Sequence, residues 1–212
     1  LSALPVIITV FVALSRTRDT AREQALDQLD SVAELKRNDI ERWLDDSQSS
    51  LKLVLADDVD ATRFNLLSNA TSTSIRALTN TVNEMLSNHA EAHSGFNEFF
   101  YYSTNGAVLA ASNEDIIGQN VASRPYFAES LLGPHVELPF YWLGDPEQRM
   151  IITQPIYDTQ GELDGVLAGR LDMVTLNEIM AVRAGLGETG ETYLVSVSGN
   201  NLLTPSRFEG YE

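Results

Sequence analysis

An uncharged apolar run opens the chain: Leu1–Leu14 (LSALPVIITVFVAL) carries no charged side chain, and Arg16 and Arg18 follow it. A full membrane span needs about 20 apolar residues, so this run is too short for a complete one. We interpret residues 1–16 as a transmembrane helix whose amino-terminal part is missing. A signal peptide fits less well, because no small-residue cleavage site precedes the helix-forming sequence that follows. The two arginines leave the orientation of the span open.

Helical periodicity dominates the next segment, Thr17–Asp57, which contains neither Gly nor Pro. Its apolar residues recur at three-and-four spacing, which predicts one long helix with a single apolar stripe. The stripe consists of Leu26, Leu29, Ala33, Ile40 and Trp43. Lys36, Ser47 and Ser50 fall on the same stripe, so the pattern is too irregular for a long coiled coil. The stripe fits packing on its own domain and contact with a second copy in a homodimer about equally well.

A second helix is predicted over Thr71–Ser94, with Gly95 as its terminator. Its apolar face combines Ile75, Leu78, Val82, Met85 and His89. Residues 17–94 therefore form a long helix and a returning helix.

Beyond Gly95 the pattern changes from helical to extended. Phe96–Tyr102 and Ala107–Ala111 are apolar runs joined by Thr104, Asn105 and Gly106, which favour a tight hairpin. Turn-forming clusters separate further predicted strands, which we expect to form an antiparallel meander. These strands are Val136–Trp142, Arg149–Tyr157 and Gly165–Met173.

Short helices are predicted over Val121–Leu132 and Leu176–Val182. The resulting fold class is α+β, a long N-terminal helix followed over residues 95–184 by a module with PAS-like order. Residues 185–212 contain two more predicted strands, Thr192–Val197 and Leu202–Thr204. Because so short a segment cannot complete a second sheet, we interpret it as the beginning of another module.

Composition excludes several functions. The formal net charge of -16 disfavours nucleic acid as a partner, because phosphate backbones are bound through Lys and Arg. The absence of cysteine excludes disulfides and thiolate metal sites. No nucleophile-elbow motif organises the Ser, His and Asp residues, so the sequence predicts no enzyme and no cofactor. His89 and His93 stand one helical turn apart, but no third ligand is evident and we predict no metal site.

Several segments, in this order, resemble the double Cache sensor domains of bacterial receptors. They are Tyr102–Ser112 (YSTNGAVLAAS), Ile117–Phe127 (IGQNVASRPYF), Thr153–Asp158 (TQPIYD), Gly165–Gly169 (GVLAG) and Gly185–Val195 (GLGETGETYLV). The resemblance implies an extracytoplasmic ligand-binding domain of a receptor in the bacterial inner membrane. It also implies that residues 185–212 open a membrane-proximal module. Such receptors usually continue into a histidine kinase, a chemotaxis signalling region or a cyclic-nucleotide enzyme.

The resemblance places a ligand between the short helix and the sheet. The candidate ligand-binding residues there are Arg124, Tyr126, Tyr141, Arg149, Thr153, Tyr157 and Asp158. The guanidinium fork of Arg124 suits a carboxylate, although an ion pair within the protein is an equally good interpretation. Tyr126 and Tyr157 combine a ring face with a hydroxyl. Asp158 fits either an ammonium group or, more simply, a turn.

One position departs from the amino-acid-binding subgroup of this family. That subgroup has an aspartate shortly after the Gly-Val pair of the late strand, where this chain has Arg170. A cation there repels an ammonium group, so we expect a carboxylate or another small anion as ligand. The main alternative is a membrane-tethered scaffold or dimerisation module whose pocket is degenerate.

Overall fold

A computed structural model of the chain describes most of its residues. These are residues 3–56, 58–68, 75–93, 95–141, 148–183, 185–187, 189–197 and 201–208, without the side chains of residues 3–17 and 58–61. The chain divides into two compact units, one of residues 42–177 and the other of residues 1–41 with residues 178–212. Each unit is described by itself.

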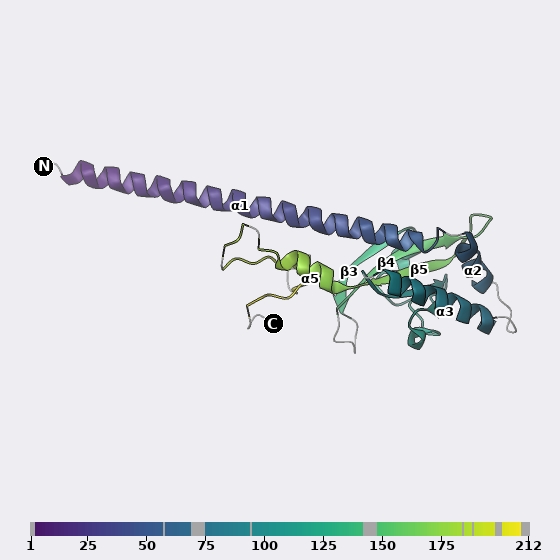
Figure 1. Cartoon of the computed structure of the whole chain (residues 1–212). Helices are drawn as coiled ribbons and strands as arrows, with labels where there is room; N and C mark the ends of the chain where they lie inside the picture. Colours follow the sequence, from purple (N-terminus) through teal and green to yellow (C-terminus); the bar gives the residue numbers. More distant parts are fainter. Residues whose placement is uncertain are drawn as a thin grey trace. The chain divides into compact units, whose positions relative to one another are not determined.

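The first helix, α1 (Ala3–Leu53), is 51 residues long and continuous through the predicted boundary at Thr17 (Figure 1). The predicted long helix is therefore confirmed, although it ends at Leu53 rather than at Asp57, which lies outside the described residues. Within the part of the chain that the structure describes, no helix is long and apolar enough to cross a membrane. The transmembrane segment expected over residues 1–16 stays a prediction.

The predicted stripe is buried only in part in the unit of residues 1–41 and 178–212. Leu26 and Leu29 are 51% and 53% exposed, whereas Lys36, which falls on the same stripe, is buried together with Val32. Lys36 donates to the carbonyl oxygens of Ile179 and Val182. These carbonyl groups lie at the C-terminal end of a helix, where backbone carbonyls lack partners within the helix. The Lys36 ammonium group therefore stabilises the packing of α1 on this helix end better than an apolar side chain would. Burial lowers the pKa of Lys36.

Two further helices belong to the unit of residues 42–177. α2 (Asp58–Ser68) was not predicted, and α3 (Ile75–Ala92) lies within the helix predicted over Thr71–Ser94. Residues 71–74 and 94 lie outside the described residues. α3 buries Val82, Met85 and Leu86 as well as the polar Asn83. The Asn83 side-chain oxygen accepts a hydrogen bond from the Ala111 backbone N–H at 3.0 Å, which satisfies a polar group that burial would otherwise penalise.

Five strands form one antiparallel sheet in the order β2-β1-β5-β4-β3. The strands are β1 (Phe96–Ser103), β2 (Val108–Ala111), β3 (His135–Tyr141), β4 (Gln148–Tyr157) and β5 (Leu163–Leu171). All of them were predicted within a few residues, and Trp142 lies outside the described residues. The predicted hairpin of β1 and β2 is confirmed, but the continuous meander was wrong, because β2 lies at the edge of the sheet instead of pairing with β3, and β1 pairs with β5. Burial explains this order: both faces of β1 are apolar, so β1 takes an interior place in the sheet.

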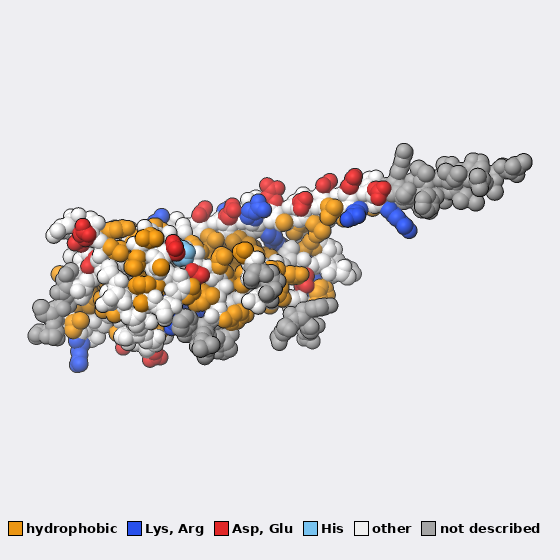
Figure 2. Space-filling model, turned by 180° about the vertical axis from the view of Figure 1, so that it is seen from behind, with side chains coloured by type: hydrophobic (Ala, Val, Ile, Leu, Met, Phe, Trp, Pro, Cys, Tyr) orange, Lys and Arg blue, Asp and Glu red, His pale blue; other side chains and the backbone are white. Residues whose placement is uncertain are grey.

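The two faces of the sheet have different partners. On one face the Tyr101 ring packs against Phe64 of α2 at 4.8 Å, and its hydroxyl hydrogen-bonds to Ser68 at 2.5 Å. On the other face Phe100, Tyr102 and neighbouring apolar side chains form a second core cluster. Strand alternation separates these residues, since Tyr101 points opposite to Phe100 and Tyr102. Figure 2 shows hydrophobic side chains gathered over this unit.

The segment between β2 and β3 contains much less helix than predicted. Glu114–Ile116 forms a 3-10 turn, and α4 (Phe127–Ser130) has 4 residues where a helix over Val121–Leu132 was expected. Pro125 accounts for part of the difference, because a proline disfavours helical geometry in the residue before it. Arg124 instead sits in successive tight turns, with its N–H bonded to the Val121 carbonyl at 2.9 Å.

Beyond β5 the chain enters α5 (Met173–Ala181), close to the predicted Leu176–Val182. The Asp172 carboxylate accepts the Val174 N–H at 2.9 Å at the start of this helix. The two strands predicted near the carboxyl end reduce, among the described residues, to a single antiparallel bridge between Val195 and Leu202.

Candidate functional site

A small cavity of about 40 Å³ lies on the sheet face that carries Phe100 and Tyr102, within the unit of residues 42–177. Its lining combines apolar side chains with several that are polar or charged. The lining residues are Glu98, Phe100, Val108, Ile116, Gln119, Val121, Arg124, Tyr126, Phe140, Arg149 and Ile151.

Glu98 of β1 and Arg149 of β4 line this cavity, and Arg170 of β5, the strand between them, lies beside Glu98. Alternation along β1 places Glu98 on the same face as Phe100. The β1–β5 register pairs Glu98 with Arg170, and the β5–β4 register pairs Arg170 with Ile151. Arg149 lies two residues before Ile151 on β4 and therefore shares its face. One acidic and two basic side chains thus meet on a strip that runs across β1, β5 and β4.

The opposite wall comes from the turns before α4. Tyr126 is 3% exposed, and its ring packs against Phe100, Tyr102 and Phe140 at centroid distances of 6.5, 6.3 and 6.2 Å. These contacts fix the segment that carries Arg124. The Tyr102 hydroxyl donates to Ser130 Oγ at 2.7 Å and so ties α4 to the sheet.

Glu98 is the acidic member of the lining and is 3% exposed. Its Oε2 lies 3.4 Å from Arg170 Nε. Burial raises the pKa of Glu98, and the neighbouring Arg170, Arg149 and Asn113 side chains act in the opposite direction. The carboxylate is therefore held in an environment that penalises its charge more than the arginines compensate for it.

Arg124 and Arg149 bring positive charge to the same cavity. Burial lowers the pKa of Arg124, and the nearby charge of Arg149 lowers it further, while Tyr126 acts in the opposite direction. Burial raises the pKa of Tyr126, against the influence of both arginines. A guanidinium group stays protonated in spite of such effects, so the cavity holds two permanent cations beside one carboxylate. An anion is the ligand that this arrangement accommodates best.

The structure gathers some of the residues predicted from sequence and separates others. Arg124, Tyr126 and Arg149 line the cavity. Tyr141 and Tyr157 are 61% and 50% exposed and are not among the lining residues. Thr153 is buried in β4, with its hydroxyl 3.4 Å from the His135 carbonyl.

Asp158 forms a turn between β4 and β5. Its Oδ1 accepts the backbone N–H groups of Gln160 and Glu162 at 2.8 and 2.9 Å. The sequence favoured a turn role for Asp158, and the structure places this residue in a turn.

Sequence reasoning missed Glu98, Gln119 and Phe140. A signal for Glu98 was present, because it is a single charged residue in the aromatic run Phe96–Tyr102 and shares the parity of Phe100. A charge that alternation turns toward the core indicates either a buried ion pair or a site. Gln119 and Phe140 carry no comparable signal.

No group of three His, Cys, Asp or Glu side chains suited to a metal occurs among the described residues. His89 and His93 stack with ring centroids 5.9 Å apart. His93 Nδ1 lies 3.0 Å from the His89 carbonyl oxygen, so this ring is engaged locally.

The site is thus a charged cavity on one face of an antiparallel sheet in an α+β unit. The family model described as Cache domain matches residues 17–209, and the chain belongs to this family. Among curated proteins, none matches the chain in sequence.

Solved structures agree on the fold. The sensor domain of the histidine kinase DctB from V. cholerae is 22% identical with a TM-score of 0.56, over 77% of this chain and 60% of that one. The ligand-binding domain of the Pseudomonas aeruginosa amino acid chemoreceptor PctC, in complex with GABA, is 21% identical with a TM-score of 0.60, over 84% of this chain and 73% of that one. The ligand-binding domain of the Pseudomonas fluorescens chemoreceptor CtaA, in complex with L-isoleucine, is 20% identical with a TM-score of 0.60, over 89% of this chain and 71% of that one. The chain thus spans 60% of the DctB sensor domain.

The Cache fold with its long helix and five-stranded antiparallel sheet is therefore established, as the sequence predicted. The family match covers residues 17–209 and so includes the whole sheet. The similar solved structures include the sensor domain of one histidine kinase and ligand-binding domains of chemoreceptors in complex with small ligands.

Proposed function

We propose that this domain is the extracytoplasmic sensor of a bacterial transmembrane receptor and that it binds a small carboxylate-bearing molecule in the cavity of about 40 Å³. The observation that carries the proposal is the placement of Arg124 and Arg149 together in the wall of this cavity. A guanidinium group offers paired N–H donors that match the two oxygens of a carboxylate. The amino acid ligands of related domains fit this proposal, since they bear carboxylates.

Three of the predicted site residues have defined roles in this proposal. Arg124 grips the ligand carboxylate from the turn before α4, and Tyr126 closes the apolar wall beside it. Arg149 adds charge from β4. Residues 1–16, which are continuous with α1 from Ala3 onward, anchor the domain to the membrane.

The test is a thermal-shift titration of the purified chain with small organic acids. A ligand at about 100 times its Kd stabilises the folded state by about 2.7 kcal/mol, which is readily detected. We expect Arg124→Ala to abolish the shift. Arg76→Ala is the matched control, because Arg76 is an exposed arginine on α3 and its loss removes the same charge away from the cavity.

Two results would contradict the proposal: a panel of carboxylates that never stabilises the parent chain, or a shift that Arg124→Ala leaves intact. Circular dichroism of Arg124→Ala establishes that the variant is folded before its binding is compared.

A dimerisation role for α1 is the second candidate, and it rests on the exposure of Leu26, Leu29 and Ala33 along one stripe of the described chain. An apolar stripe of this kind is stabilised by contact with a second copy. Sedimentation equilibrium of the parent and of Leu26→Glu/Leu29→Glu tests it. A parent that stays monomeric at high concentration contradicts this role.

A further inference from the structure

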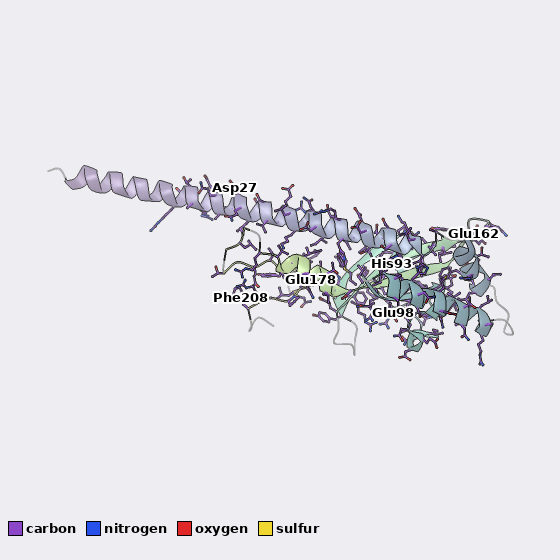
Figure 3. The ribbon with its side chains drawn as sticks, in the orientation of Figure 1. Asp27, His93, Glu98, Glu162, Glu178 and Phe208 are labelled. Carbon is purple, nitrogen blue, oxygen red and sulfur yellow. The ribbon has the colours of Figure 1, made fainter. Side chains whose placement is uncertain are left out.

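A buried carboxylate oxygen in the cavity wall lacks a hydrogen-bond partner. Glu98 is 3% exposed, and its Oε2 faces Arg170 at 3.4 Å. Its Oε1 is buried and makes no hydrogen bond to any residue that the structure describes. A buried acceptor in this condition is unfavourable, and nearly all such atoms in folded proteins have partners. Glu98 is labelled in Figure 3, amid the side chains of the sheet.

We propose that Glu98 Oε1 accepts a hydrogen bond from a hydroxyl group of the ligand, so that the site selects small hydroxycarboxylic acids over the corresponding unsubstituted acids. This inference rests on the proposed function, in which Arg124 and Arg149 hold the carboxylate. The ligand then presents two complementary groups, an anion toward the turns before α4 and a donor toward β1.

Charge decides between a hydroxyl and an ammonium donor. Arg170 lies against the other oxygen of the same carboxylate, and Arg149 from β4 also acts on Glu98. An ammonium group beside Glu98 would meet these cations at short range in a medium of low dielectric constant. A hydroxyl donates the same hydrogen bond without a net charge, so it gains the contact and avoids the repulsion.

The cavity volume limits the size of the ligand. About 15 Å³ of such space suffices for one water molecule, so a cavity of about 40 Å³ holds on the order of three. A two- or three-carbon acid is close to this size. Larger acids require the wall formed by the turns before α4 to move outward.

Matched ligands provide the test. Lactate, propionate and alanine share a carboxylate and a methyl group and differ at C2, where they carry a hydroxyl, a hydrogen and an ammonium group. Titration calorimetry of the full chain measures the Kd of each, with both enantiomers of lactate and alanine. Malate and succinate form a second pair for a larger site. We expect the hydroxy acid to bind about 10- to 100-fold more tightly than its unsubstituted partner, the factor typical of one buried hydrogen bond to a charged group.

A double variant tests the role of Glu98 without leaving a buried charge alone. Glu98→Met/Arg170→Met replaces the ion pair by apolar side chains of similar volume, a change that proteins often tolerate. We expect this variant to bind lactate and propionate with Kd values within about twofold of each other, since one hydrogen bond is lost and the arginines of the carboxylate site remain. Glu162→Gln, at an exposed glutamate in the turn before β5, is the control and keeps the parent selectivity.

The outcomes separate this inference from the proposed function. Equal affinity of lactate and propionate, and of malate and succinate, for the parent chain overturns the inference and leaves the carboxylate site standing. Tightest binding of alanine, or undiminished selectivity in the double variant, also overturns it. If no carboxylate of either pair binds the parent, the proposed function fails and the inference fails with it.

Discussion

Removal of Arg170 should destabilise the fold in a manner that depends steeply on pH. In Arg170→Met the nearly buried Glu98 loses the cation that lies 3.4 Å from its Oε2. The carboxyl group can then either stay ionised without this partner or take up a proton. Protonation at pH 7 of a group whose ordinary pKa is 4.5 costs about 3 kcal/mol, so this figure is the upper limit of the loss. At pH 5 the same limit falls below about 1 kcal/mol.

The sign of this dependence follows from linkage. Burial already raises the pKa of Glu98 above that of the unfolded chain, and loss of Arg170 raises it further. The folded state of the variant binds this proton more tightly than the unfolded state does, so its stability is retained near pH 4.5 and is lost as the pH rises. Arg149 stays in place and keeps the loss below the upper limit.

Urea denaturation of the parent and Arg170→Met at pH 5 and pH 7, followed by circular dichroism, measures the difference in the free energy of unfolding. Glu98→Gln/Arg170→Met is the matched control, because it has no titratable group at position 98 and should lose the pH dependence. A destabilisation by Arg170→Met that is equal at both pH values would refute the reasoning.

Other consequences of the structure are testable in the same chain. Tyr102→Phe removes the buried donor to Ser130 Oγ, and urea denaturation should show a loss of about 1 to 2 kcal/mol; an unchanged midpoint would contradict this. In Gly165→Ala the added methyl would meet the Tyr101 ring at 2.6 Å, so thermal unfolding should reveal a loss of about 1 to 3 kcal/mol, and an equal Tm would argue against that contact. A bound anion should raise the pKa of Glu98 further, so carboxylate affinity should increase as the pH falls toward 5; calorimetry in buffers of different ionisation enthalpy should detect proton uptake, and its absence would exclude this coupling.

The strands could be predicted because the pattern of apolar residues along each one matches the burial of its two faces in the sheet. Phe96–Ser103 and Leu163–Leu171 are apolar on both faces, which is the pattern of interior strands. Their adjacency could not be predicted, because local sequence does not specify which interior strands pair. α2 was missed for a related reason: its residues show almost no helical stripe, and its burial depends on the contact of Phe64 with Tyr101.

The site residues that could be predicted from sequence include polar side chains next to a recognisable turn signal. Arg124 and Tyr126 flank Pro125, and both line the cavity. Tyr141 and Tyr157 were grouped with them because the family resemblance places the ligand against the sheet, and their positions at the ends of β3 and β4 leave them exposed. The parity of Glu98 with Phe100 was a signal in the sequence, but the ion-pair partner of Glu98 could not be predicted, because it depends on the register with Arg170.

The strip of charged residues across β1, β5 and β4 has a consequence for how such sensors diversify. Positions 98, 149 and 170 lie on strands of the sheet, on the face opposite to the Tyr101 ring that packs against α2, so their exchange leaves the packing of α2 untouched. A lineage that acquired Arg170→Asp would present two neighbouring carboxylates and would come to favour cationic groups. New ligand preferences are therefore within reach of single codon changes, without a change in the fold.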